Sequence, residues 1–201
     1  MRDVIINNSL SFIKKNNPDF SNEKLAEIEY GLVSIYLLIS KLIIIIILAY
    51  ILGIVKEMLI FSCLYNVIRI PSFGLHATKS WICLLVSSIM FLGLPILCKY
   101  IVIIPIIKFI LGMIVTLFIF KNSPADTHKR PIVSPMRRKV FKTISTIISI
   151  IFVIVSLYIK NNFISNSLII SLVLQSLFIS PTVYKIFKLP YNNYKNYNLE
   201  N

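Results

Sequence analysis

Residues 69–83 read RIPSFGLHATKSWIC and lie between two hydrophobic stretches of the chain. Pro71, Ser72 and Gly74 resist regular helix, so this stretch predicts a bend that leads into a new helix at about His76. The stretch also holds one of the two histidines and one of the three cysteines of the chain. We therefore expect the hydrophobic segments to be arranged about this bend.

His76 and Cys83 are the candidate catalytic pair. An imidazole can take the proton of a thiol, and the resulting thiolate can attack a carbonyl carbon. Seven residues span about 10.5 Å along a straight helix, so contact requires the bend before His76. We expect Cys83 about two turns into the helix, where the helix dipole still slightly favours a thiolate. A lone pair of this kind is more often two unrelated residues, so the assignment needs support from elsewhere in the chain.

The composition predicts an all-α, polytopic integral membrane helix bundle. Of the 201 residues, 57% are hydrophobic and only 14% are charged, and the mean hydropathy is +0.82. A soluble domain of this length could not bury so much apolar surface. The 21 Lys and Arg against 8 Asp and Glu are first a topology signal in such a protein. No aromatic residues interleave with a solvated basic face, so we expect no nucleic-acid partner.

Six hydrophobic segments follow one another at residues 31–55, 58–69, 80–98, 101–120, 143–159 and 164–180. Lys41 interrupts the first, and the second is about half the length of a straight crossing. Either Lys41 snorkels or residues 42–55 dip into the bilayer, and it stays open whether these two segments span. Lys56 and Glu57 are expected to mark the turn between them. Lys108 lies in the middle of a segment and is expected to face protein.

Three regions follow from this pattern. Residues 1–30 are expected to form an amphipathic region on the cytoplasmic membrane surface, residues 31–180 the bundle, and residues 181–201 a loosely ordered cytoplasmic tail. The first thirty residues carry five of the eight acids and no uninterrupted apolar core. They therefore do not match a cleavable signal peptide.

The charges predict the orientation in the cell membrane. Residues 121–142 hold seven of the 21 positive charges, whereas the connections at 99–100 and 160–162 carry one each. The positive-inside rule then places the basic loop and both termini in the cytoplasm. Counting back along the segments puts His76 and Cys83 at the cytoplasmic edge, where a thiol stays reduced.

A second motif lies in the basic loop, where residues 123–131 read SPADTHKRP. Asp126 is the only acid in this loop, and Glu57 is the only other acid between Tyr30 and Leu199. Asp126 either orients His76 or pairs with Lys129 and Arg130 within an exposed loop. We favour the local pair, because an exposed acid beside bases commonly forms one.

The two motifs together resemble the accessory gene regulator B (AgrB) family of quorum-sensing membrane endopeptidases. The likeness consists of a Gly–x–His–Ala element, a Cys seven residues after the His, and a Pro–Ala–Asp–Thr–x–x–x–Pro loop two segments later. It spans essentially the whole chain and implies that His76 and Cys83 form the catalytic dyad. Members usually have two adjacent glycines before the His element. Here Phe73 replaces the first and only Gly74 is kept.

The resemblance also implies a reaction and a partner. Cys83 would cut the C-terminal tail from a small propeptide and form a thioester, which an internal Cys or Ser of the peptide would open to close a thiolactone or lactone ring. A site at the membrane edge limits water, so the internal nucleophile can outcompete hydrolysis. The propeptide is expected to carry an acidic tail, which basic residues such as Lys129 and Arg130 can attract.

Other residues have simpler interpretations. Cys63 and Cys98 are expected to be packing residues, and His128 a solvated loop residue. Two distant histidines and the absence of an HExxH sequence predict no metal site, and no cofactor is expected. The alternative functions are a small peptide transporter, with Lys41 and Lys108 lining a path, or a non-catalytic scaffold. We expect a homodimer, because short interrupted segments can be buried against a second copy.

Overall fold

The structure is a computed structural model that describes residues 2–18, 20–75, 80–126 and 132–197 of the chain. Within these ranges it consists of helices and contains no strand, apart from one isolated backbone bridge. Four helical stretches are long and apolar enough to cross a membrane, namely Glu23–Ile51, Trp81–Tyr100, Pro105–Asn122 and Pro135–Tyr158. The prediction of an all-α polytopic membrane bundle is confirmed. The chain divides into two compact units, Met1–Ile51 and Leu52–Asn201.

The first unit is a pair of helices, α1 (Arg2–Asn16) and α2 (Asn22–Ile51). The Ser21 hydroxyl accepts the backbone N–H of Lys24 at 3.2 Å, as a residue at a helix start commonly does. Helix α2 is continuous over 30 residues, or about 45 Å, so Lys41 does not interrupt it. Its length exceeds the hydrocarbon thickness of a bilayer.

The second unit begins with α3 (Val55–Ser72), which is longer than its apolar segment suggested. The chain turns at Gly53, whose φ is +65°, and Lys56 and Glu57 belong to the first turn of α3. The prediction that these two residues mark the turn is therefore wrong. Pro71 and Ser72 are buried in the last turn of α3, so the bend starts at Phe73, later than predicted.

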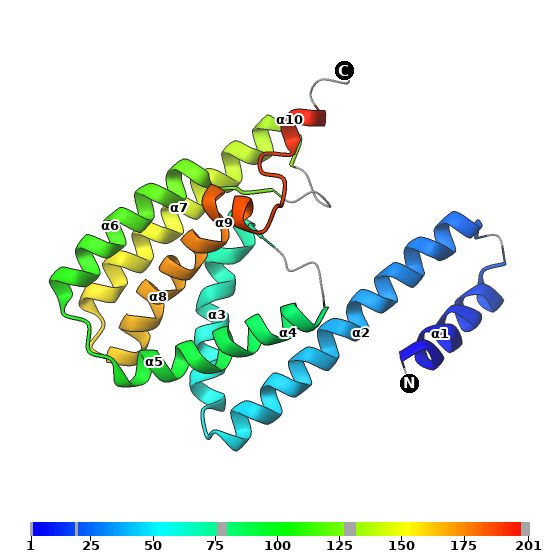
Figure 1. Ribbon diagram of the computed structural model, residues 1–201, viewed down its shortest axis with the longest axis horizontal. Helices are drawn as coiled ribbons and strands as arrows, with labels where there is room; N and C mark the ends of the chain where they lie inside the picture. The colour runs from blue at the N-terminus through cyan, green and yellow to red at the C-terminus, as the bar shows by residue number, and fades with distance from the viewer. Residues whose placement is uncertain (1, 19, 76–79, 127–131, 198–201) are drawn as a thin grey trace. The chain divides into compact units, whose positions relative to one another are not determined.

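The remaining helices run from α4 to α10, and Figure 1 shows their order. Helix α4 (Ser80–Ser88), a π-helical turn at Ile89–Gly93 and helix α5 (Leu94–Tyr100) follow one another without a break. The others are α6 (Pro105–Asn122), α7 (Pro135–Tyr158), α8 (Asn162–Phe178), α9 (Pro181–Ile186) and α10 (Tyr194–Tyr197).

Helix α7 begins inside the predicted basic loop. Ser134 caps it by accepting the backbone N–H of Arg137 at 3.5 Å, and Pro135 occupies its first position. The polar connection between α6 and α7 is therefore residues 123–134, shorter than the predicted 121–142. Arg138 and Lys142 consequently have fixed positions on a helix.

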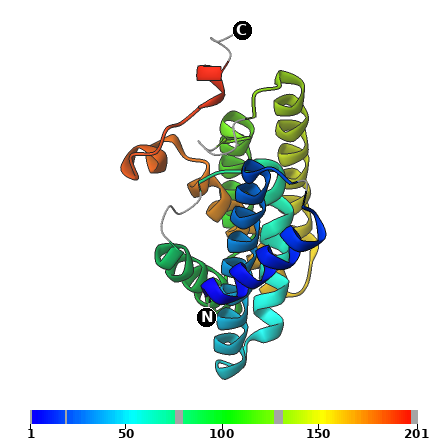
Figure 2. The same cartoon turned by 90° about the vertical axis from the view of Figure 1, so that its right-hand side faces the viewer.

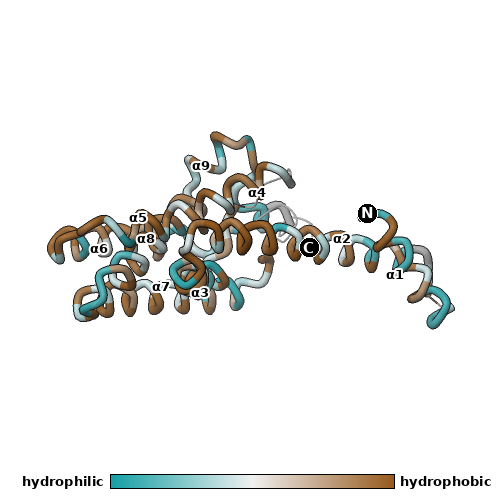
Figure 3. The backbone as a smooth tube through the Cα atoms, turned by 90° about the horizontal axis from the view of Figure 1, so that it is seen from below, coloured by the Kyte–Doolittle hydropathy of each residue, from teal (hydrophilic) through white to brown (hydrophobic). Residues whose placement is uncertain are grey.

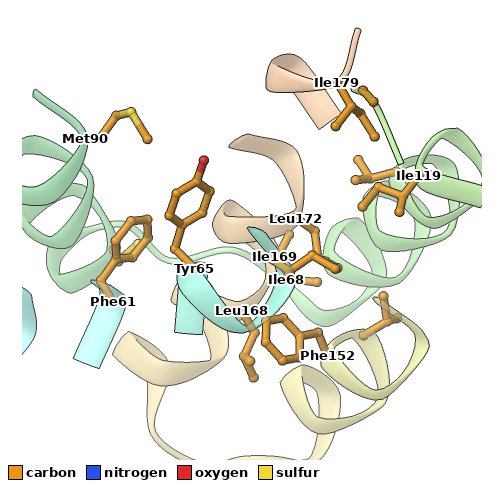
Figure 4. Close-up of a cluster of buried hydrophobic side chains, with 14 of the residues drawn as sticks. Phe61, Tyr65, Ile68, Met90, Ile119, Phe152, Leu168, Ile169, Leu172 and Ile179 are labelled. Carbon is orange, nitrogen blue, oxygen red and sulfur yellow. The ribbon is translucent and has the colours of Figure 1, made fainter. Parts of the chain in front are cut away.

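Helix α8 lies at the centre of the second unit and packs against α3, α5, α6 and α7. Figure 4 shows Ile68 of α3 with Ile169 and Leu172 of α8 in one buried cluster. Buried serines on α8, such as Ser167 and Ser171, allow close approach of neighbouring helices. The outer faces carry large exposed hydrophobic residues, and Figure 3 shows hydrophobic residues along the lengths of these helices. This distribution is typical of helices that face lipid.

Lys108 faces protein, as predicted. It is 5% exposed, and its Nζ donates to the Ser165 hydroxyl at 2.6 Å. The Ser165 hydroxyl in turn donates to the Ser156 carbonyl at 2.5 Å. Among the described residues, the partner of the Lys108 ammonium group is therefore a hydroxyl and not a carboxylate. This hydrogen bond links α6 to α8.

Candidate active site

The bend after α3 has an unusual backbone conformation at two consecutive residues. Phe73 has φ +57° and ψ −138°, and Gly74 has φ +112°. Glycine adopts such angles without steric cost, whereas a residue with a Cβ does not. A Cβ at Gly74 would also lie 2.7 Å from the Phe178 carbonyl oxygen and 2.7 Å from Arg69 Nη1. Gly74 is therefore required both by its conformation and by its close neighbours.

Backbone hydrogen bonds from two distant segments hold this bend. The Gly74 N–H donates to the Ala125 carbonyl at 2.8 Å, and the Ala125 N–H donates to the Ser72 carbonyl at 3.1 Å. These bonds form a parallel bridge between Phe73 and Ala125. The Leu75 N–H donates to the Phe178 carbonyl at the end of α8 at 2.9 Å. Residues 123–126, here called the SPAD motif, and the end of α8 thus fix the chain immediately before His76.

Two side chains satisfy the carbonyl groups of the bend. Arg69 donates from Nη1 to the Phe73 carbonyl at 2.7 Å and from Nη2 to the Leu75 carbonyl at 2.6 Å. Gln175 Nε2 donates to the same Phe73 carbonyl at 2.8 Å. The sequence did not predict that Arg69 or Gln175 would contact the bend. The signal for Gln175 was an amide within the apolar stretch 164–180, where an unsatisfied polar group is costly.

Asp126 is fully buried, with 0% exposure, so its interpretation as an exposed acid is wrong. Its Oδ2 accepts the backbone N–H of Tyr194 at 2.8 Å and lies 3.8 Å from Arg138 Nη1. The Tyr184 hydroxyl donates to the Asp126 backbone carbonyl at 3.2 Å. Lys129 and Arg130, the predicted partners of Asp126, lie outside the described residues. Arg138 and Tyr194 were not predicted.

The predicted loose tail is instead folded from Pro181 to Lys195. Figure 2 shows α9 and α10, in orange and red, after the end of α8. Tyr184 is 1% exposed, and its ring packs edge-on against the ring of Tyr191, with the ring centroids 5.1 Å apart. The Tyr191 hydroxyl donates to Asn122 Oδ1 at 3.4 Å. Burial raises the pKa of both tyrosines above the ordinary value, so both hydroxyls remain protonated donors at neutral pH.

Arg138 connects the tail to the start of α7. Its guanidinium carbon lies 3.4 Å from the Tyr194 ring centroid, and its Nη2 donates to the Pro124 carbonyl at 3.5 Å. A pocket opens beside this contact, and its lining includes the basic residues Lys121, Arg138, Lys139 and Lys142. This arrangement can attract an anionic group.

Cys83 lies on α4, whose described part begins at Ser80, and the predicted helix start near His76 lies outside the described residues. Its side chain is half-buried and its thiol is free. Cys98 is buried, as predicted, whereas Cys63 is exposed on α3, so its prediction as a packing residue is wrong. His76 and His128 lie outside the described residues. Among the residues that are described, no cluster of three His, Cys, Asp or Glu could hold a metal ion.

Comparisons with known proteins agree with these motifs. A family model described as accessory gene regulator B matches residues 6–179. An AgrB-like protein of Clostridium acetobutylicum is 29% identical over 171 residues, which cover 85% of this chain and 82% of that protein. AgrB-like proteins of Listeria monocytogenes (28% over 190 residues; 92% and 91% covered) and Lactiplantibacillus plantarum (31% over 155; 77% and 77%) are also similar. No solved structure matches this chain.

Proposed function

Because this chain belongs to the accessory gene regulator B family, whose members take part in quorum-sensing peptide processing, we propose that it is the membrane cysteine endopeptidase of that process. Its substrate is a small propeptide with an acidic C-terminal tail. Cys83 is the nucleophile and His76 is the general base. Neither residue needs a metal or a cofactor for this chemistry.

The observation that carries this proposal is the construction of the bend before His76. The backbone of residues 73–75 is held by Arg69, Gln175, Ala125 and Phe178. A general base must be positioned precisely against its nucleophile, and a fixed backbone limits where the following residue can lie. The half-buried Cys83 follows seven residues after His76 in the sequence and lies near the beginning of the described part of α4, and negative charge is favoured near the start of a helix.

The reaction proceeds in two steps. His76 takes the proton of the Cys83 thiol, and the sulfur attacks the scissile carbonyl carbon. The peptide C–N bond breaks, and the leaving amine of the tail takes the proton from His76. An internal thiol or hydroxyl of the bound peptide then gives its proton to His76 and attacks the thioester, which closes the ring and releases Cys83. The internal nucleophile competes with water through its high effective concentration.

Charge on the protein favours the acidic tail of the substrate. The pocket beside Arg138 is lined by Lys121, Lys139 and Lys142, and Lys129 and Arg130 follow Asp126 in the sequence. Such an excess of positive charge speeds the encounter with an anionic peptide. The site faces the cytoplasm in this proposal, both termini are cytoplasmic, and the protein acts as a homodimer.

The first prediction tests the nucleophile. Cys83→Ala should abolish cleavage of the propeptide substrate, because the attacking sulfur is gone, and Cys83→Ser should do the same. Cys63→Ala is the matched control, since Cys63 is exposed and has no role in the proposal. The measurement is single-turnover cleavage in reconstituted vesicles. Full cleavage by Cys83→Ala would falsify the assignment.

A further inference from the structure

The C-terminal segment, residues 181–197, lies beyond the matched family region, which ends at residue 179. It is nevertheless one of the elements that reach the SPAD motif. Tyr184 donates to the Asp126 carbonyl, Tyr191 donates to Asn122, and the Tyr194 N–H donates to the Asp126 carboxylate. Three separate contacts therefore join this segment to the last residue of α6 and to Asp126 in the connection that follows it.

The contact at Tyr194 is the strongest of the three on physical grounds. A hydrogen bond to an ionised carboxylate is shorter and stronger than one between neutral groups. Asp126 is fully buried, so its charge must be compensated within the protein. Arg138 Nη1 lies 3.8 Å from Oδ2 and supplies an opposite charge, while its guanidinium stacks on the Tyr194 ring. Two groups therefore hold the Asp126 carboxylate, namely the Tyr194 backbone N–H and the Arg138 guanidinium.

Asp126 is linked to the bend through one residue, Ala125. Ala125 precedes Asp126, and its carbonyl and N–H groups are the partners of Gly74 and Ser72. The position of Asp126 therefore sets where Ala125 can pair with the bend. A displaced Asp126 would release the Gly74 N–H bond, which lies two residues before His76.

We propose that the C-terminal segment is a positioning element of the peptide-processing site, acting through the Tyr194 N–H, Asp126 and Ala125 on the bend that precedes His76. This inference rests on the proposed function of His76 and Cys83. Asp126, Arg138 and the backbone N–H of Tyr194 are the positioning groups in it. They act on the catalytic pair through the backbone of residues 73–75.

A substitution of Tyr194 tests the inference because the decisive donor is a backbone N–H. Tyr194 is the first residue of α10, a position that accepts proline without disturbing the helix. Tyr194→Pro removes both the N–H and the ring. Tyr194→Ala removes the ring and keeps the N–H, so it is the matched control. The difference between the two variants reports the bond to Asp126.

The readout is the rate of Cys83 alkylation by iodoacetamide between about pH 6 and 9, a range that contains the reference values of His and Cys. The rate is measured by mass spectrometry on the full chain in lipid nanodiscs. In the wild type, His76 should support alkylation near neutral pH. Tyr194→Pro should slow alkylation about tenfold at pH 7 and move the profile towards that of His76→Ala, with recovery at high pH. Tyr194→Ala should stay within about threefold of the wild type.

The outcomes separate this inference from the proposed function. If His76→Ala leaves the wild-type profile unchanged, the proposed base role fails. If His76→Ala shifts the profile but Tyr194→Pro and Tyr194→Ala behave alike, the positioning role of the segment is overturned. A second variant, Arg138→Gln, removes the opposing charge and should shift the profile in the same direction as Tyr194→Pro. A profile of Arg138→Gln that coincides with the wild type would also contradict the inference, even if Tyr194→Pro fails to fold.

Discussion

At the scale of single residues, Phe73 is the most informative departure from the family pattern. The resemblance to the family implies glycine at this position, and the φ of +57° and ψ of −138° are angles that glycine adopts without steric cost. A residue with a Cβ held in this region costs about 1–3 kcal/mol. The phenyl ring offsets part of this cost, because it packs edge-on against Phe141 with ring centroids 5.1 Å apart. At Phe73, backbone strain therefore destabilises the fold and the aromatic contact stabilises it.

This opposition gives a prediction about stability. Phe73→Gly removes the ring contact and relieves the backbone, whereas Phe73→Ala removes the ring contact and keeps a Cβ in the strained conformation. We expect Phe73→Gly to be more stable than Phe73→Ala by about 1–2 kcal/mol, the reverse of the usual order of these residues. Thermal unfolding in detergent, compared between the two variants, measures this. Equal or greater stability of Phe73→Ala would show that the position carries no strain.

At the scale of elements, close approach between helices shapes the bundle around α8. A Cβ on Gly112 of α6 would lie 2.6 Å from Val153 Cγ2 of α7 and 3.4 Å from Ile169 Cδ1 of α8. Because Gly112 has no side chain, the backbones of α6 and α7 can approach each other closely. Close approach strengthens van der Waals contact between helices in a membrane. The Lys108 to Ser165 hydrogen bond joins α6 to α8.

Gly112→Ala should therefore destabilise the bundle by about 1–3 kcal/mol, because the added methyl group overpacks the contact with Val153. Gly93→Ala is the matched control, since a Cβ at Gly93 would meet no atom within 4 Å. The measurement is the unfolding temperature of both variants in the same detergent. The close-approach argument fails if the two substitutions change this temperature equally.

At the scale of the whole molecule, the helices set the orientation relative to the membrane. Helix α7 runs from Pro135 to Tyr158, which is about 36 Å and long enough to cross the hydrocarbon region. Ser134 precedes this helix beside a cluster of basic residues, and Asn161 follows it beside a single lysine. The two residues should therefore lie on opposite sides of the membrane, with Ser134 in the cytoplasm.

Cysteine labelling tests this orientation. Ser134→Cys and Asn161→Cys are each introduced into a variant in which Cys63 is alanine, and intact cells are treated with an impermeant thiol reagent. We expect label at position 161 and none at position 134 until the cells are opened. Label at 134 but not at 161 in intact cells would reverse the orientation and move the proposed site to the outer face.

The sequence by itself determined the membrane class, the order of the helices, the bend at Gly74 and the two motifs. These features follow from local patterns, because apolar runs, glycine and proline act on the neighbouring backbone. Local patterns did not predict where the helices begin and end. Pro71 lies within α3, and α7 begins inside the predicted basic loop.

Only the tertiary structure decided the partners of Asp126 and the state of the tail. The Tyr194 N–H lies 68 residues from the carboxylate that it reaches, and Gln175 lies 102 residues from the carbonyl that it satisfies. A polar residue that looks solvated in a basic loop can be buried when a distant segment covers it. The charge of the buried residue then requires a partner. The packing of the helices, and not the neighbouring sequence, determines which residue is that partner.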